Sequence, residues 1–159
     1  MIISLQTERT LRASIDAVFA LALDPARFPA TFTGCGPIPA LRNITPHAPT
    51  AVGSTRSVES SDNSTLQERV TAFEPPHLHA YVLSGMRPPL AWLAREGRAE
   101  WRFTTIGANT TIVWRYDFEL TSPLAWPIAA PVLSGFMRTA MARCLAAMAT
   151  MLEPREGAR

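Results

Sequence analysis

The stretch PVLSGFMRTAMARCLAAMATML, residues 131–152, decides the fold of this chain. Its apolar side chains recur at spacings of three and four residues, which is the period of one face of an α-helix. Pro131 suits the first turn of a helix, and Pro154 favours the end of one. Arg138 and Arg143 are its only charged residues. The pattern predicts one long amphipathic helix, with an apolar stripe of Leu133, Phe136, Met137, Ala140, Met141, Cys144, Leu145, Met148, Met151 and Leu152.

The chain before this helix shows mainly the strand pattern of apolar runs broken by turn residues. Ser14 is a typical N-cap residue and predicts a short helix after the first strand. A second short helix, carrying Phe28 and Phe32, is expected from Asp24-Pro25 to Gly34. Neither helix is long enough to cross over a parallel sheet, so we expect an antiparallel sheet with both helices at one end. Strands are expected at residues 2–12, 40–45, 54–60, 64–73, 77–86, 96–105 and 109–121.

The last two strands form a hairpin whose register follows from the sequence. Gly107-Ala108 has glycine first, as a two-residue type II′ turn requires. This turn sets Trp101 opposite Trp114 on an apolar face and Glu100 opposite Arg115 on the other face. A shift of two residues would oppose side chains of like charge, which is unfavourable. The aromatic face is therefore expected to contact the helix, and the charged face is expected to contact solvent.

The hairpin formed by the strands at 54–60 and 64–73 is expected to carry two charged side chains inward. A loop of odd length over residues 61–63 puts Val58 on the core face and makes Arg56 and Glu68 inward-facing neighbours. If the loop length differs by one, both charges face solvent, and the sequence leaves these alternatives open. Unpaired charges inside the protein would be costly, so an inward pair must contact each other, water or a ligand.

The next turn adds a tyrosine and a histidine to this expected interior. A four-residue turn over residues 74–77 sets Val70 opposite Tyr81 and Ala72 opposite His79. An interior that holds arginine, glutamate, tyrosine and histidine among aromatic residues is not an ordinary dry core. These polar groups are therefore candidates for contact with a ligand.

No metal site or disulfide is predicted. His77 and His79 share a face of one strand, but two partly exposed histidines at a strand edge are expected rather than a pair of metal ligands. Cys35 and Cys144 are far apart and too few for a disulfide framework or a zinc site. Cys144 lies in the apolar stripe, where a small buried apolar role is expected and a thiol in a pocket is the alternative.

Length and composition indicate one globular domain over residues 1–159. Hydrophobic residues make up 47% of the chain, which is enough for a substantial core. The net charge is +2 and the positive residues are all arginines, scattered along the chain, which argues against a nucleic-acid surface. No basic segment followed by an apolar one begins the sequence, and the longest apolar run, residues 123–136, is too short to span a bilayer. A cytoplasmic protein without a membrane segment is therefore expected.

Several segments match one known superfamily in placement. They are SIDAVF (residues 14–19) with Asp24 and Phe28-Pro29, GSTR (53–56), ERVTAFEPPHLHAY (68–81), NTTIVW (109–114) and the final helix. In this order they resemble the START-like helix-grip superfamily (SRPBCC, or polyketide cyclase/dehydrase-like proteins). The resemblance implies an α+β fold in which a curved antiparallel sheet wraps around the C-terminal helix, with a cavity for an apolar ligand. It does not imply one chemistry, because members include lipid carriers, hormone receptors, cyclases and chaperone activators.

This cavity is the candidate site. The chain contains no catalytic motif such as a phosphate-binding glycine loop or Gly-x-Ser-x-Gly. Arg56 and Glu68 are expected to orient the polar end of a ligand. Trp92, in the connection at residues 87–94, is expected to act as a gate, and a packing anchor is the alternative. The other residues expected to line the cavity are Phe28, Phe32, Tyr81, Trp101, Trp114, Met137, Met141 and Cys144.

Three functions fit such a cavity. The preferred hypothesis is non-enzymatic binding of a small apolar, amphipathic or aromatic molecule, without a cofactor or metal, by a monomer or homodimer. The second is an aromatase or cyclase that uses Arg56, Glu68, Tyr81 or His79 for proton transfer. The third is a protein-interaction module like the chaperone activators, which predicts an exposed apolar patch and no cavity large enough for a ligand.

Overall fold

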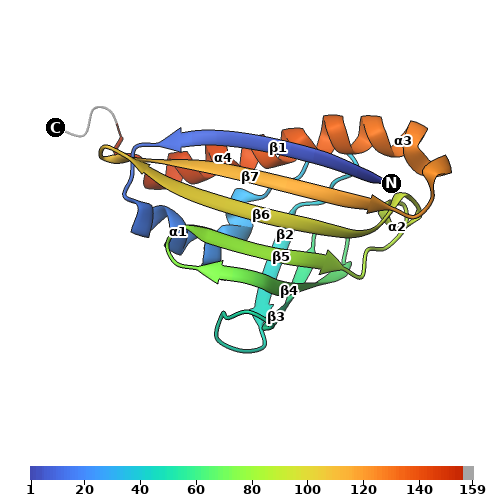
Figure 1. Cartoon of the computed structure of the whole chain (residues 1–159), viewed down its shortest axis with the longest axis horizontal. Helices are drawn as coiled ribbons and strands as arrows, with labels where there is room; N and C mark the ends of the chain where they lie inside the picture. The colour runs from blue at the N-terminus through green and yellow to red at the C-terminus, as the bar shows by residue number, and fades with distance from the viewer. Residues whose placement is uncertain (156–159) are drawn as a thin grey trace.

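The sheet of this protein curves around one long helix (Figure 1). The computed structural model describes residues 1–155, and within them seven antiparallel strands form one sheet in the order β1-β7-β6-β5-β4-β3-β2. The α+β helix-grip fold expected from the sequence is confirmed, and each predicted strand end lies within two residues of the observed one. The strands are β1 (Ile2–Leu11), β2 (Leu41–Pro46), β3 (Thr55–Ser60), β4 (Thr65–Glu74), β5 (Leu78–Ser84), β6 (Ala94–Ile106) and β7 (Asn109–Leu120).

Two short helical segments follow β1, as predicted. In α1 (Ile15–Leu23) the Ser14 hydroxyl accepts a hydrogen bond from the Ala17 N–H at 3.3 Å, which is the expected N-cap contact. The second segment is shorter than predicted and consists of one 3₁₀ turn, η1 (Phe28–Thr31). Proline has no N–H to donate, so Pro25 and Pro29 prevent a longer ladder of helical hydrogen bonds.

The C-terminal helix begins before the predicted position. After a 3₁₀ turn, η2 (Pro123–Ala125), helical structure runs from α3 (Trp126–Pro131) through a π-helical turn, η3 (Val132–Met137), into α4 (Arg138–Leu152). The predicted start at Pro131 is therefore wrong. Pro127 occupies the first turn, and Pro131 lies inside the helix, where it removes a hydrogen bond and the wider π turn follows. No helix within residues 1–155, this one included, is long and apolar enough to cross a membrane.

Most of the predicted apolar stripe packs against the sheet, but two of its members do not. Phe136 and Met151 are each 43% exposed, which corrects the prediction. Phe136 lies in the π turn, whose extra residue rotates it out of the α-helical period. Its ring instead packs on Gly36, where a Cβ atom would come within 2.5 Å of the ring. Met151 lies in the last turn of α4.

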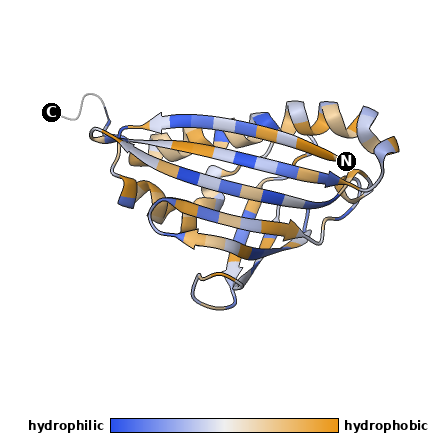
Figure 2. Cartoon of the chain, viewed as in Figure 1, coloured by the Kyte–Doolittle hydropathy of each residue, from blue (hydrophilic) through white to orange (hydrophobic). Residues whose placement is uncertain are grey.

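The β6–β7 hairpin has the predicted register. Trp101 pairs with Trp114, and Glu100 pairs with Arg115. Gly107 has a φ of +60°, as the first position of a type II′ turn requires. Both tryptophans are buried, whereas Arg115 on the opposite face is exposed. Figure 2 shows the resulting mixture of apolar and polar positions along the strands.

The β4–β5 hairpin differs from the prediction by a β-bulge. Tyr81 pairs with Val70, as expected. The register then shifts by one residue, so that His79 pairs with Phe73 and not with Ala72. A bulge leaves one residue of a strand unpaired and increases the local twist. It needs no glycine or proline, so the sequence contains no sign of it.

Candidate functional site

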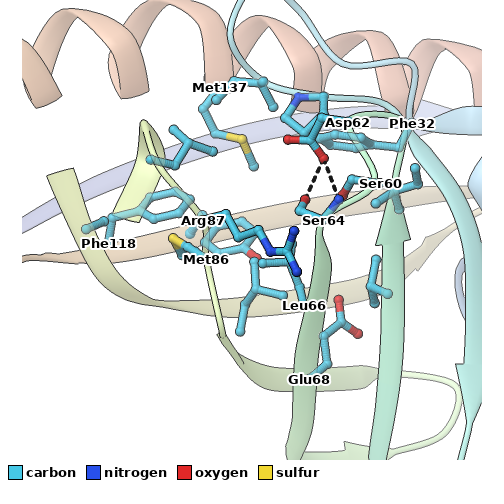
Figure 3. Close-up of a pocket in the computed structure, with 18 of the residues that line it drawn as sticks. Phe32, Ser60, Asp62, Ser64, Leu66, Glu68, Met86, Arg87, Phe118 and Met137 are labelled. Atoms are coloured by element: carbon cyan, nitrogen blue, oxygen red, sulfur yellow. Dashed lines mark hydrogen bonds between the residues drawn. The ribbon is translucent and has the colours of Figure 1, made fainter. Parts of the chain in front are cut away.

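A cavity lies between the inner face of the sheet, the C-terminal helix and the connection from β5 to β6 (Figure 3). Leu133 and Met137 of η3 line one side, and strand residues such as Val58 and Phe118 line the other. Most of the lining side chains are apolar, as is usual for small-molecule sites. The cavity volume is about 100 Å³. This is less than the roughly 300–1,000 Å³ of pockets that take drug-sized ligands, so the cavity suits a group of about one aromatic ring.

Seven of the eleven residues predicted for the site line this cavity. They come from η1 and the residue after it, from four strands and from η3, which are far apart in the sequence. All seven are buried. These residues are Phe28, Phe32, Arg56, Glu68, Tyr81, Trp114 and Met137.

Trp92 does not line the cavity. It belongs to α2 (Leu90–Leu93), a single helical turn in the connection from β5 to β6. Leu90 and Leu93 of this turn border the cavity, whereas Trp92 is 69% exposed. Leu90 and Leu93 are three residues apart and therefore share one face of the helical turn, whereas Trp92 points in another direction. The alternative that Trp92 is a packing anchor is therefore wrong, whereas its role as a gate stays a prediction.

Trp101, Met141 and Cys144 lie behind the cavity wall, in the core. Trp101 stacks on Trp114 with ring centroids 4.1 Å apart, and only Trp114 borders the cavity. Met141 and Cys144 are completely buried in α4. The Cys144 Sγ lies 3.4 Å from the Thr31 hydroxyl, and burial raises the pKa of the thiol to about 12. A neutral thiol packed in this way fits the expected apolar role of Cys144.

Arg56 and Glu68 form an ion pair inside the protein. They lie directly opposite each other on β3 and β4, so the predicted odd-length loop and inward placement are confirmed. The Arg56 Nε donates a hydrogen bond to Glu68 Oε2, and the two side chains are 11% and 8% exposed. Burial raises the pKa of the Glu68 carboxyl, and the charge of Arg56 opposes this rise. Burial alone would lower the pKa of Arg56, but Glu68 and Tyr81 raise it, so the guanidinium stays charged.

Arg56 also contacts two aromatic residues. Its Cζ lies 5.5 Å from the centroid of the Tyr81 ring, which is a cation–π distance. Its Nη2 lies 3.5 Å from Nε2 of His79. Because a guanidinium only donates, we assign Nε2 as the acceptor and place the histidine proton on Nδ1. Burial and the charge of Arg56 lower the pKa of His79 to about 3, so His79 is neutral at neutral pH.

The interpretation of His79 as a partly exposed residue at a strand edge is wrong. His79 is 2% exposed because it lies two residues before Tyr81 and therefore on the same inward face. His77, in the turn before β5, is exposed. Residues 1–155 contain no cluster of three histidine, cysteine, aspartate or glutamate side chains that could hold a metal ion.

We expect His79 to stay neutral well below its ordinary pKa of 6.5. Because the fold lowers this pKa, the neutral form stabilises the protein above about pH 6.5, and this contribution is lost as the pH falls towards 3. An NMR titration of the imidazole resonances should show no midpoint for His79 between about pH 7 and about pH 5. His79→Gln assigns the signal, and His77→Gln is the exposed control. A His79 midpoint above about pH 5 would contradict its buried position.

A second polar group lies at the mouth of the cavity and was not predicted. The Asp62 carboxylate accepts hydrogen bonds from the Ser64 hydroxyl at 2.6 Å and from the Ser64 N–H at 3.0 Å (Figure 3). These bonds lower the pKa of Asp62. Ser60 and Arg87 line the same region. The Asp62-Asn63 sequence predicts a turn, but a turn motif does not say which cavity its side chains border.

One buried donor in the cavity wall has no partner. Trp114 is 2% exposed, and its Nε1 has no hydrogen-bond partner among residues 1–155. The large majority of buried polar side-chain atoms in proteins do have a partner. The ring is held by its stack on Trp101 and by an edge contact with Phe32 at a centroid distance of 6.2 Å. This tryptophan therefore keeps a buried N–H group without a hydrogen-bond partner in the described part of the chain.

Solved structures of other proteins share this fold. Zhui aromatase/cyclase from Streptomyces sp. R1128 matches with a TM-score of 0.74 at 15% identity, over 95% of this chain and 93% of that chain. Norcoclaurine synthase from Thalictrum flavum, in complex with dopamine and hydroxybenzaldehyde, has a TM-score of 0.69 at 12% identity, with 95% and 86% covered. Ara h 8.0201 has a TM-score of 0.69 at 12% identity, with 94% and 97% covered. At such low identities the likeness shows the fold alone.

A match to a protein family covers nearly the whole chain. No curated protein matches it in sequence. The model of the family described as "Polyketide cyclase / dehydrase and lipid transport" matches residues 3–153. These residues include β1 from its second residue onward, the other six strands and the long helix. The chain therefore belongs to the polyketide cyclase/dehydrase and lipid transport family.

Proposed function

We propose that this protein binds a small, mainly apolar aromatic molecule in the cavity between the sheet and the C-terminal helix. The observation that supports this proposal is the composition of the wall, which is mostly apolar with a few polar groups at fixed positions. Phe28 and Trp114 would contact the rings of the ligand. Arg56 and Glu68 would contact its polar part. Met86 and Met137, which also border the cavity, are unbranched and can adapt to its shape.

The states of the titratable groups favour binding over catalysis. A general acid or base works best with a pKa near the operating pH. Glu68 is held by Arg56 in an ion pair that a proton transfer would break. Burial raises the pKa of Tyr81 above its ordinary value of 10. His79 is neutral and lies outside the cavity wall. These groups support a carrier or receptor role more than a cyclase that uses them.

An exposed apolar surface favours a second candidate function, which is contact with another protein. This surface lies at one end of the molecule, where α2 and α3 contact each other (Figure 1). The interaction hypothesis requires such a surface, but it also requires the absence of a ligand cavity. The cavity therefore makes this the second choice. The surface residues are Trp92, Leu124, Trp126 and Ile128.

We expect Leu133→Trp to weaken ligand binding strongly without unfolding the protein. Leu133 is buried and borders the cavity, so a larger side chain would occupy the space of the ligand. Filling an existing cavity typically leaves stability unchanged or raises it. Calorimetric titration with acetophenone should show binding by the wild type and a loss of at least about tenfold in affinity in Leu133→Trp, a difference of about 1.4 kcal/mol.

Ile106→Trp is the matched control for this experiment. Ile106 is exposed at the end of β6, so the same side chain is added outside the cavity, and acetophenone affinity should not change. Native mass spectrometry of the wild type, compared with the denatured mass, would reveal any molecule that copurifies. If the wild type binds no probe and carries no copurified molecule, the ligand-binding proposal fails and the protein-contact function is favoured.

A further inference from the structure

The run of residues 123–133, PLAWPIAAPVL, carries most of the exposed apolar surface at the α2–α3 end and has almost no hydrogen-bonding side chain. The Trp126 indole is the one polar side-chain group in this run. Protein interfaces of standard size contain about ten direct hydrogen bonds and have a polar rim. Leu124 is 89% exposed, so its side chain projects from the surface and does not line a groove. A projecting apolar side chain suits a fluid apolar phase better than a second folded surface.

Residues 123–127, where the C-terminal helical run begins, have no unpaired backbone N–H group. The N–H groups of residues 124–126 donate to the hydroxyl and the carbonyl of Ser122 and to the carbonyl of Pro123. Pro123 and Pro127 have no N–H group. The start of a helix usually leaves four N–H groups without a partner in the helix, which water can satisfy and hydrocarbon cannot. The backbone here is therefore suited to an apolar medium.

The exposed charges that the two segments of this surface carry are positive. Residues 84–95 and 120–152 contain arginines but no aspartate or glutamate. Arg87 lies just before α2 and is exposed. Arg95 is also exposed, and its Nη2 donates a hydrogen bond at 3.3 Å to the carbonyl of Thr121, which precedes η2. The surface therefore favours a partner that carries negative charge.

Acidic side chains near this surface already have partners. Glu96 begins β6 and Glu119 ends β7, and both are half-buried and contact Arg98, at 2.7 Å and 3.7 Å. Glu119 also lies 4.0 Å from Arg95. Asp62 accepts its hydrogen bonds within the β3–β4 turn. These pairs reduce the repulsion of an anionic partner, and Arg87 belongs to none of them.

We infer that this end of the molecule binds the surface of a bilayer that contains anionic lipids. Trp92 and Trp126 lie at the level of the headgroups, where tryptophan is enriched in membrane proteins. Leu124 and Ile128 contact the acyl chains, and Arg87 contacts lipid phosphates. The inference goes beyond the proposed function and does not depend on it. It assigns a lipid partner to the exposed apolar surface, in place of the protein partner of the second candidate function.

Cosedimentation of the full chain with vesicles tests this inference. One set of vesicles contains phosphatidylcholine alone, and in the other about one third of the lipid is phosphatidylglycerol. The protein should bind the anionic vesicles roughly tenfold more tightly at low salt, and this preference should shrink as salt screens the charges. Binding should also shift the emission of the exposed tryptophans to shorter wavelength, because their rings leave water. Equal binding to both kinds of vesicle, or to neither, would overturn the inference.

Two matched pairs of variants locate the contact. Ile128→Ser should weaken binding to the anionic vesicles at least about fivefold. Ile106→Ser makes the same change at the far end of β6, where the side chain is 56% exposed against 63% for Ile128, and should leave binding unchanged. Arg87→Gln should weaken binding roughly fivefold, whereas Arg115→Gln on the outer face of the sheet should not. If the control variants weaken binding as much as their partners, another surface binds the bilayer and the inference is wrong.

Analytical ultracentrifugation tests a second copy of the chain as the partner. A monomer in both the wild type and Ile128→Ser supports the inference, because the surface then stays free in the absence of lipid. A wild-type dimer that Ile128→Ser dissociates would assign the surface to a second copy and overturn the inference. Ile128 does not border the cavity, so Ile128→Ser should bind acetophenone as the wild type does. Loss of vesicle binding is therefore distinguishable from a failure of the proposed function.

Discussion

Glu68→Ala is expected to lower the free energy of unfolding by about 3–5 kcal/mol, although little apolar surface is lost. The substitution leaves the Arg56 guanidinium without its ion-pair partner while its side chain is only 11% exposed. Other charged groups can lose their charge when they are buried, but arginine stays protonated in proteins. The cost therefore appears as lost stability. Urea unfolding followed by tryptophan fluorescence measures this difference.

Two further variants test whether burial is the cause. Glu59→Ala is the matched control. Glu59 lies on β3, the strand that carries Arg56, but it pairs with Arg42 on the exposed surface at 3.3 Å. Exposed ion pairs contribute little, so stability should hardly change. Replacing both buried partners together, Arg56→Met with Glu68→Leu, should recover most of the loss, because no charge is then left unpaired. If Glu68→Ala costs no more than Glu59→Ala, the ion pair is not buried as described.

The β6–β7 register could be predicted because two independent signals agree. The Gly107-Ala108 turn sets the phase, and the shifted register is rejected because it opposes like charges. The prediction that Arg56 and Glu68 face inward rests on one signal. This signal is the odd number of residues in a loop that has no defining glycine. One residue more or less in that loop reverses both side chains, so the sequence leaves their direction open. The structure has the odd-length loop.

The bulge in β4 and the π turn in the C-terminal helix could not be predicted. Each adds one residue to a regular element and needs no special residue type. Pro131 illustrates the difficulty, because a proline is compatible with the first helical turn and also with a helix interior that is locally distorted. Whether the helix continues through the proline depends on how much free energy the residues on either side gain by packing. That packing exists only in the folded protein.

The sequence predicts which face a side chain occupies but not how far the cavity extends. Trp101 and Trp114 share the inner face of the sheet, yet only Trp114 borders the cavity. Met137 and Met141 share the inner side of the helix, but only Met137 borders the cavity. The end of the cavity is set by packing between elements, which no period in the sequence records. Trp92 lies in a connection without periodicity, so no pattern gives its direction.

Met141→Ala is expected to cost about 2–5 kcal/mol of stability, and Met137→Ala is expected to cost less. The two residues lie one turn apart in the same helix and undergo the same change, so helix propensity cancels in the comparison. Met141 is completely buried in the filled core, and its truncation opens a new cavity whose walls lose their contacts. Met137 already borders an empty space, so its truncation enlarges that space instead. Urea unfolding of both variants measures the difference.

The two methionine variants should also differ in ligand preference. The variant that loses less stability, Met137→Ala, should show the larger change in preference. Met137→Ala widens the cavity, so it should favour 2-acetonaphthone, which has two fused rings, over acetophenone more strongly than the wild type does. Met141→Ala leaves the lining side chains in place and should not change this preference, even though it is the less stable variant. Such a reversal cannot come from general loosening of the fold, because loosening would affect binding most in the variant that loses the most stability. If Met141→Ala changes the preference as much as Met137→Ala, the ligand reaches further along α4, and Met141 and Cys144 belong to the site after all.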